Sequence, residues 1–557
     1  MSATNSYLKK IYNDTLWGAA WFSWYDFPVT DSVLVAGDVS QCALKELNRR
    51  FTRMTVFNEQ EEYNGCVFSA VLVCGGLGSR EKNELFLDSA GKMLSENGVL
   101  LWAADNKLGV RFLCGDVHFS DEGQYFSRKE WEAMFQEAGM PVTGVYGLMP
   151  GWHLLRNVFS DKCPLSSDNF DRLEYHYVKP ECMFADEREI LENIALGANF
   201  FVMANALLLE YRAKPVNQFV LYADMYADKE EENASVIMRI DDGTVIKKPL
   251  FVRGDVEHIY RYGEELRNRG LKVIPQKYDL GNIVMPYLDA PLLTRIMAEV
   301  AAESVEGFHQ LLLRFWKCIL ASSELTEESN FPIKDIDLGP TLVSAYLDMI
   351  PGNAFLINDE FVFFDQEYCC SNYPAKFVLY RSLETLYGGE PEIEDFVPIE
   401  LVKKWFALCE VWPFFHEVDR NVFIRRVRQE NIYANYQKKY GPNYCAIARN
   451  KKALSRMDML AEYDLFATLG ERKVVLFGSG MYADRYLQQY GYKYPPIFMI
   501  DNDEKKWNTY KNNIEIVSPE IITGMDKNKL MIIICSRYDK EIGKQLKTMG
   551  IEDYKVY

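Results

Sequence analysis

Residues 31–105 alternate between apolar runs and helical segments, and this alternation restricts the fold more than any other feature of the chain. Apolar runs of this length, bounded by turn residues, predict buried strands, which lie at residues 32–37, 54–57, 68–75 and 98–104. The segments between them, at 42–50 and 82–97, have the spacing of amphipathic helices. Because strands that alternate with helices form parallel sheets with helical crossovers, the sequence predicts an α/β domain here.

The pattern changes near residue 213, and a chain of 557 residues is too long for one hydrophobic core. Short strands separated by turns then predict a small antiparallel lobe, with strands at 219–222, 235–240 and 244–248. From about residue 292 the chain is mainly helical, and residues 421–468 read as a charged helical connector. The segment after residue 468 again alternates between strands and helices.

Charge and cysteine usage exclude several classes of function. The formal net charge of −18 argues against nucleic acid as a partner, because phosphate backbones bind basic surfaces. The six histidines form no cluster and the twelve cysteines include no C-x-x-C pair, so free, reduced thiols are expected. No apolar run is long enough to span a bilayer, and the first residues carry no apolar signal core. We therefore expect a soluble, cytoplasmic protein.

Two polar motifs in sequence order give the sharpest functional signal. Asp348 is followed five residues later by Asn353, and a second acid, Asp365, ends the apolar run 361–364. This is the spacing of kinase-like phosphotransferases, in which the first Asp accepts the proton of the attacking hydroxyl. The Asn and the second Asp hold the Mg²⁺ that bridges the phosphates of ATP. The motifs therefore predict phosphoryl transfer, with Asp348 as base and with Asn353 and Asp365 as metal ligands.

Upstream residues complete this predicted site. Lys247 ends a predicted strand, where a lysine can pair with nucleotide phosphates, and the helix that follows carries Glu264. We expect Glu264, or one of two other glutamates on that helix, to orient the lysine. The sequence departs from the kinase pattern at two points, since Tyr346 stands where a His is usual and residues 224–233 are charged rather than glycine-rich.

A second glycine-containing loop lies near the C-terminus. A predicted strand at 473–477 leads into Gly478-Ser-Gly480 and a helix, and a further strand ends at Asp501. Glycines permit a tight turn, a helix N-terminus attracts phosphate, and an acid at this distance can bind a ribose hydroxyl. The set predicts a site for a nucleotide or dinucleotide, and a packing module with an empty loop is the alternative.

Three stretches of the N-terminal region carry a family resemblance, and they lie at residues 21–27, 101–115 and 125–131. They resemble class I S-adenosylmethionine (SAM)-dependent methyltransferases of bacterial surface-polysaccharide biosynthesis, in which a kinase-like domain with the two polar motifs often follows. The resemblance implies an α/β multidomain chain. Its parts would be a Rossmann-like methyltransferase fold at 1–212, a kinase-like two-lobed α+β domain at 213–420, the connector 421–468, and a small C-terminal Rossmann-like α/β domain at 469–557.

The resemblance also implies SAM as a cofactor, held by the loop after the first strand. Of the glycines usual in that loop only Gly37 is present, and Val35 stands where an acid is usual. Asp38 and Glu59 are the nearby acids that would replace it. A domain retained for packing or for acceptor binding is the alternative, since a fold does not dictate a function.

Three hypotheses for the function follow from these sites. The first is an ATP- and Mg-dependent phosphotransferase that acts on a hydroxyl of a sugar, nucleotide-sugar or glycan acceptor. The second is a bifunctional SAM-dependent methyltransferase–kinase that modifies or caps a glycan. The third is a non-catalytic scaffold that binds a nucleotide or other glycan-biosynthesis enzymes.

Overall fold

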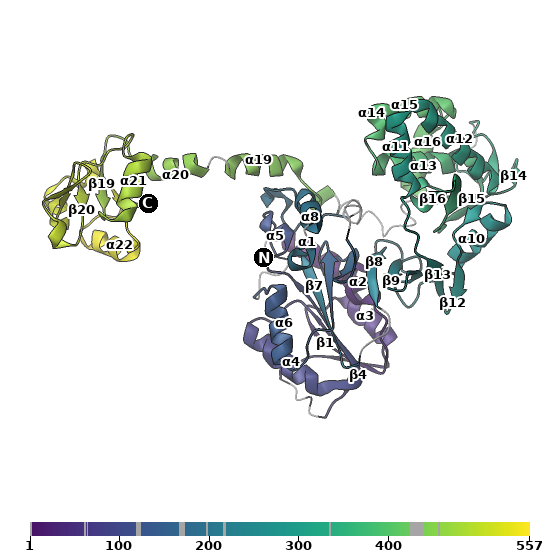
Figure 1. Cartoon of the computed structure of the whole chain (residues 1–557), viewed down its shortest axis with the longest axis horizontal. Helices are drawn as coiled ribbons and strands as arrows, with labels where there is room; N and C mark the ends of the chain where they lie inside the picture. The colour runs from purple at the N-terminus through teal and green to yellow at the C-terminus, as the bar shows by residue number, and fades with distance from the viewer. Residues whose placement is uncertain are drawn as a thin grey trace. The chain divides into compact units, whose positions relative to one another are not determined.

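The computed structural model describes residues 3–60, 63, 65–118, 124–165, 173–196, 199–214, 219–333, 336–423, 436, 438–454 and 457–557. The chain forms two compact units, Met1–Ile447 and Ala448–Tyr557 (Figure 1). Among the described residues no helix combines the length and the apolar character needed to cross a bilayer. All twelve cysteines are free thiols.

A twelve-stranded sheet runs through the first unit, and its N-terminal part has the order β2-β1-β3-β4-β7-β5-β6. The first four of these strands are parallel, whereas β7 runs antiparallel between β4 and β5. The strands are β1 (Ser32–Gly37), β2 (Arg53–Val56), β3 (Phe68–Cys74), β4 (Leu94–Asp105), β5 (Gly144–Met149), β6 (Asn157–Ser160) and β7 (Ala206–Arg212). The order confirms the α/β sheet with a methyltransferase-like Rossmann arrangement.

Both faces of the central strands β1 and β3 are buried, which explains why these strands are mainly apolar rather than alternating. In β1, Val33 and Val35 face one core and Leu34 and Ala36 face the other. The first core contains α2 (Trp17–Ser23) and α3 (Gln41–Arg50), and the second contains α4 (Arg80–Met93) and α6 (Arg128–Glu137).

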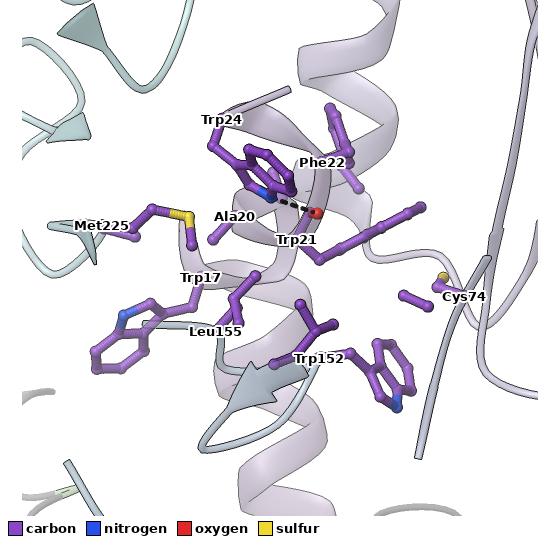
Figure 2. Packing of buried hydrophobic residues seen from close by; sticks show 14 of the residues in the cluster. Trp17, Ala20, Trp21, Phe22, Trp24, Cys74, Trp152, Leu155 and Met225 are labelled. Atoms are coloured by element: carbon purple, nitrogen blue, oxygen red, sulfur yellow. Dashed lines mark hydrogen bonds between the residues drawn. The ribbon is translucent and has the colours of Figure 1, made fainter. Parts of the chain in front are cut away.

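The tryptophans in and directly after α2 lie in the first core. Figure 2 shows Trp21 and Trp24 beside Trp152 and Met225, with the Trp24 indole donating to the Trp21 carbonyl oxygen at 3.1 Å. Met225 lies on β8, which comes after the first α/β segment in the chain. The core therefore continues from the N-terminal domain into the following lobe.

The remaining five strands of the large sheet are antiparallel and have the order β12-β13-β10-β9-β8. They are β8 (Val220–Met225), β9 (Ser235–Ile240), β10 (Thr244–Pro249), β12 (Lys277–Asp279) and β13 (Asn282–Pro286), with α10 (Glu257–Asn268) between β10 and β12. Strand β8 pairs antiparallel with β6, in the register Asn157↔Asp224. This pairing makes the sheet continuous between the two parts.

A mainly helical segment follows, as the sequence predicts. Its helices include α11 (Leu293–Glu303), α12 (Val305–Ala321), α13 (Ala375–Gly389), α15 (Ile399–Trp405) and α16 (Trp412–Val418). Two three-stranded sheets lie among them, β11-β17-β16 and β14-β15-β18. Their strands are β11 (Lys272–Val273), β14 (Leu325–Thr326), β15 (Thr341–Tyr346), β16 (Ala354–Ile357), β17 (Glu360–Phe363) and β18 (Cys369–Pro374). Strands β15 and β17 lead directly into the two polar motifs.

The second unit contains a six-stranded sheet of order β21-β22-β20-β19-β23-β24, parallel except for β21. The strands are β19 (Lys473–Phe477), β20 (Met499–Ile500), β21 (Thr509–Lys511), β22 (Ile514–Val517), β23 (Leu530–Ile534) and β24 (Tyr554–Val556). Helices α21 (Met481–Tyr490) and α22 (Asp539–Thr548) pack on opposite faces. The order reverses between β19 and β23, where open α/β sheets bind their ligands.

Candidate functional site

The predicted catalytic residues come together in the first unit around a buried group of opposite charges. Lys247, on β10, is fully buried, and its Nζ donates to Asp365 Oδ1 and Glu367 Oε1. Asp365 follows β17 with a φ of +56°, a backbone conformation that turns the chain sharply at this point. The lysine and the second motif are more than a hundred residues apart, and only the fold brings them into contact.

Glu367 is shared by two lysines. Lys247 binds one carboxylate oxygen and Lys229 binds the other. Burial raises the pKa of Glu367, but the two ammonium groups outweigh burial and lower it to about 2. Burial likewise lowers the pKa of Lys247, and its two carboxylate partners outweigh burial and raise it well above the usual value. Glu367 and Lys247 are therefore held in their charged forms at neutral pH.

Asp348 lies next to this group of charges and binds the backbone of Glu367. Its Oδ2 accepts hydrogen bonds from the backbone N–H groups of Glu367, at 3.1 Å, and of Tyr368, at 2.9 Å. Burial raises the pKa of Asp348 to about 6, with Arg381, 3.8 Å from Oδ1, partly opposing the change. A carboxylate whose pKa lies close to neutral is well suited to take a proton from a hydroxyl.

Asn353 links the two motifs. Its Nδ2 donates to the backbone carbonyl oxygens of Asp348 and Asp365, both at 3.2 Å. The side-chain amide is thus held by its N–H groups, and its Oδ1 remains an acceptor. Gln366 fixes the same turn by donating to the Asp348 carbonyl oxygen at 3.0 Å.

The donor chemistry of this site fits Mg²⁺. Asp365 and the Asn353 Oδ1 are hard oxygen ligands, and Mg²⁺ is commonly held by one or two protein groups together with substrate phosphates. Among the residues the structure describes, no three His, Cys, Asp or Glu side chains are grouped as a metal site. Asp365 and Asn353 would hold bound magnesium, which would neutralise phosphate charge.

The expectation for Glu264 is wrong. Glu264 forms an ion pair with Arg267 on its own helix rather than with Lys247. Its neighbour Glu265 accepts a hydrogen bond from Tyr346 Oη at 2.7 Å. Helix α10 therefore contacts Tyr346, the residue that stands where the kinase pattern usually has a His. The role expected of a helix glutamate is taken by Glu367, because this residue follows the turn at Asp365 and points to the buried lysine.

A cleft in the N-terminal domain lies at the carboxyl ends of β1, β3 and β4. It encloses about 480 Å³ including its open mouth, and it is lined by Asp38, Gly75, Gly76, Ala104, Asp105, Gln124, Tyr125, Phe126, Trp131 and Trp152. The strand order reverses between β1 and β3, so the cleft occupies the usual ligand position of a Rossmann-like sheet. Burial raises the pKa of Asp38, with Lys9 opposing the change.

The glycines that line this cleft come from β3 and not from β1. A Cβ at Gly37 would lie 2.0 Å from the Cys74 carbonyl oxygen, so Gly37 is required for the contact between two strands. A Cβ at Gly76 would meet nothing closer than 3.6 Å, which leaves the backbone there open to a ligand. Glu59 is exposed, pairs with Lys82 at 2.9 Å and does not line the cleft, unlike Asp38. The sequence offers Gly37 as the glycine of the cofactor loop, whereas the glycines that line this cleft are Gly75 and Gly76.

A histidine borders the cleft. His118 Nδ1 lies 3.3 Å from Asp105 Oδ2, and its ring stacks on Tyr125 with a centroid distance of 3.4 Å and on Phe112 at 3.8 Å. Burial raises the pKa of Asp105, but His118 and Arg111 outweigh burial and lower it. A His whose ring is fixed by a carboxylate can act as a general base.

The C-terminal loop has the expected strand, glycines and helix, but its acid, Asp501, binds the loop itself. Gly478 has a φ of +108°, and a Cβ there would lie 2.5 Å from the Cys535 carbonyl oxygen. Asp501 accepts from the Ser479 backbone N–H at 3.0 Å and from Lys506 Nζ at 3.0 Å, so its carboxylate braces the loop. Gly480 begins α21 with no atom near its would-be Cβ. The expected ribose contact through Asp501 would compete with these bonds.

Residues 470–557 match the family described as C2185-like, N-terminal. No curated protein matches the sequence. Similar solved structures include a complex of the Haloferax volcanii Trm112 methyltransferase activator with a methyltransferase, with 14% identity over 39% of this chain and 99% of that chain and a TM-score of 0.25.

Two further similar structures are also methyltransferases. A SAM-dependent methyltransferase from Thermotoga maritima has 11% identity, covering 38% of this chain and 96% of that chain with a TM-score of 0.24. An O-methyltransferase of a Brevibacillus brevis multienzyme, solved with S-adenosylhomocysteine, has 10% identity, covering 38% and 80% with a TM-score of 0.21. The assignment of the N-terminal fold rests on the strand order described above.

Proposed function

We propose that this chain is a bifunctional transferase, with a phosphoryl-transfer centre around Asp348 and a SAM-dependent methyl-transfer centre in the N-terminal cleft. The observation that carries the first activity is the meeting of Lys247, Asp348, Asn353 and Asp365 from separate elements in one buried site. A resemblance in sequence motifs supports a hydroxyl of a sugar or glycan as the acceptor.

The chemistry of the phosphoryl-transfer centre follows from the positions of its groups. Asp348 accepts the proton of the acceptor hydroxyl, and the hydroxyl oxygen forms a bond to the γ-phosphorus of ATP. The bond between that phosphorus and the bridging oxygen breaks, and ADP leaves with the electron pair. Lys247 offers positive charge to the phosphates, and bound magnesium would be held by Asp365 and Asn353.

Turnover of ATP with a panel of sugar, nucleotide-sugar and glycan acceptors tests this activity. Asp348→Asn should lower turnover by about 10²- to 10⁴-fold, the usual contribution of a general base. Asp359→Asn is the matched control, since Asp359 is a nearby exposed acid that pairs with Arg314. Equal turnover by wild type and Asp348→Asn would reject the assignment, and a wild type that binds nucleotide without turnover would favour the scaffold hypothesis.

Methyl transfer is the second activity, and the position of the cleft supports it. Gly75 and Gly76 leave backbone open to a ligand, Asp38 and Asp105 supply carboxylates, and Trp152 supplies an apolar wall. These groups fit the polar and apolar parts of SAM, which when bound would supply an electrophilic methyl group. His118, which contacts Asp105, would accept the proton that a hydroxyl acceptor loses on methylation.

Thermal stability with SAM tests this second centre. A ligand at 100 times its Kd stabilises the folded state by about 2.7 kcal/mol, which is a measurable rise in melting temperature. Asp38→Asn should reduce the rise, whereas Glu59→Gln should leave it unchanged because Glu59 does not line the cleft. Loss of the SAM effect in Glu59→Gln alone would contradict this placement.

A further inference from the structure

Helix α13 contacts the backbone on either side of Asp348. Arg381 Nε donates to the carbonyl oxygen of Leu347 at 3.2 Å, and Ser382 Oγ donates to the carbonyl oxygen of Met349 at 2.7 Å. Ser382 is fully buried, and the Arg381 side chain is only 13% exposed. Two consecutive residues of one helix therefore fix the chain immediately before and immediately after the proposed base.

The two oxygens of the Asp348 carboxylate have different surroundings. Oδ2 accepts hydrogen bonds from the backbone N–H groups of Glu367 and Tyr368, which together use both of its lone pairs. Oδ1 lies 3.8 Å from Arg381 Nη2, which is within the range of an ion pair but too long for a hydrogen bond. Oδ1 is therefore the oxygen better suited to accept the proton of a hydroxyl, and it is the oxygen that the guanidinium approaches.

A second acid holds the guanidinium from the other side. Arg381 Nη1 donates to Asp419 Oδ1, and Asp419 directly follows α16 in the chain. The side chains of Asp348, Arg381 and Asp419 are each 12% or 13% exposed, so solvent screens their charges only in part. The donors of an arginine lie in one rigid plane, and contacts at Nε, Nη1 and Nη2 together determine how that plane is oriented. The position of Nη2 beside Asp348 is thus set by the two other contacts.

We propose that Arg381 is a positioning residue for phosphoryl transfer, which holds the Asp348 carboxylate so that Oδ1 meets the acceptor hydroxyl, and that Asp419 fixes Arg381 in turn. This inference rests on the proposed phosphoryl-transfer function. A reactive group and its base are commonly oriented by a third group in this way. Misplacement of a reacting group by about 1 Å can lower a rate by about 100-fold, so a residue that only positions the base has a measurable effect.

Steady-state kinetics with Mg-ATP, and with the acceptor of the panel above that wild type phosphorylates fastest, test this role. Arg381→Gln should lower kcat by about 10- to 100-fold and change the KM of either substrate by less than about twofold. Arg381→Lys should retain more activity than Arg381→Gln, because it keeps a positive charge near Oδ1. Arg314→Gln is the matched control and should leave kcat unchanged, since Arg314 is an exposed arginine of α12 that pairs with Asp359 at 2.8 Å.

The same substitution in an Asp348→Asn background separates positioning from direct contact with a substrate. If Arg381 acts through the Asp348 carboxylate, its replacement has little left to disturb once that carboxylate is gone. Arg381→Gln should then lower the residual kcat by less than about threefold, so the two losses should not add. A residue that binds ATP or the acceptor by itself would lower the activity by the same factor in both backgrounds.

Three results would overturn the inference while the proposed function stands. They are a wild-type kcat in Arg381→Gln, a loss confined to KM, and an equal loss of kcat in the Asp348→Asn background. A wild type that turns over no ATP, or an Asp348→Asn variant as active as wild type, would instead overturn the proposed function itself. If Arg381→Gln does not fold, Asp419→Asn replaces it, because this variant keeps the guanidinium and removes only its charged partner. Its kcat should fall by a smaller factor that also disappears in the Asp348→Asn background, and an unchanged kcat or a persistent loss would reject the role of Arg381.

Discussion

The buried carboxylate of Glu367 should be a principal source of stability in the first unit. Replacing it by Gln removes the carboxylate that binds both Lys229 and Lys247. A pKa lowered from 4.5 to about 2 corresponds to about 3 kcal/mol at neutral pH, since each pKa unit is about 1.4 kcal/mol. Removing one partner of a buried ion pair typically costs about 3–5 kcal/mol, which agrees.

The effect should also depend on pH with a definite sign. Because the pKa of Glu367 is lowered on folding, its contribution is complete above pH 4.5 and is lost as the pH falls toward 2. We expect Glu367→Gln to lower the free energy of unfolding by about 3 kcal/mol at pH 7, with a smaller difference from wild type at pH 3.5.

Urea denaturation followed by tryptophan fluorescence measures this difference, with Glu360→Gln as the control. Glu360 is an exposed acid on β17, 3.9 Å from Lys272, and its replacement should change the free energy of unfolding by less than about 0.5 kcal/mol. A loss below about 1 kcal/mol for Glu367→Gln, or a loss that does not shrink between pH 7 and pH 3.5, would refute the reasoning.

Three further results are expected. Because burial raises the pKa of Asp348 from 3.8 to about 6, Asp348→Asn should stabilise the fold at pH 8 and have no such effect at pH 3.5, as thermal melting would show. Gly37→Ala should destabilise the protein by about 3 kcal/mol, and Gly243→Ala by about 1 kcal/mol. Both glycines have positive φ, but only Gly37 lacks space for a Cβ. Equal losses of unfolding free energy in urea denaturation would count against this reasoning. Asp501→Asn should destabilise the second unit by about 1 kcal/mol and speed hydrogen exchange at the Ser479 amide, which donates to Asp501. Unchanged exchange would argue that the loop does not depend on the hydrogen bond between Ser479 and Asp501.

The strands of the N-terminal sheet could be predicted because burial on both faces leaves a direct mark on the sequence. Residues 68–74, for example, are apolar at every position except Ser69, and the structure buries all of them. Helix ends were less exact, since α4 begins at Arg80 after the capping Ser79 and ends at Met93, where the chain enters β4.

The partners of charged residues could not be read from local sequence. The sequence predicts that Glu264 pairs with Lys247, but the path of the backbone brings Glu367 to the lysine instead. Lys229 lies in the charged segment 224–233, in which the sequence distinguishes no single residue. Its burial depends on tertiary contacts of the loop, which leave no periodic signal in the chain.

The pairing of β6 with β8 has a consequence for how this chain can be divided. A cut near residue 212, at the expected domain boundary, would remove the partner of β6 and leave its N–H and C=O groups unpaired, and β8 would be exposed in the same way on the other fragment. Open strand edges recruit other chains, so each half made alone is prone to self-association. Each half of the sheet covers an edge strand of the other, which gives their fusion in one polypeptide a physical advantage that does not depend on any activity.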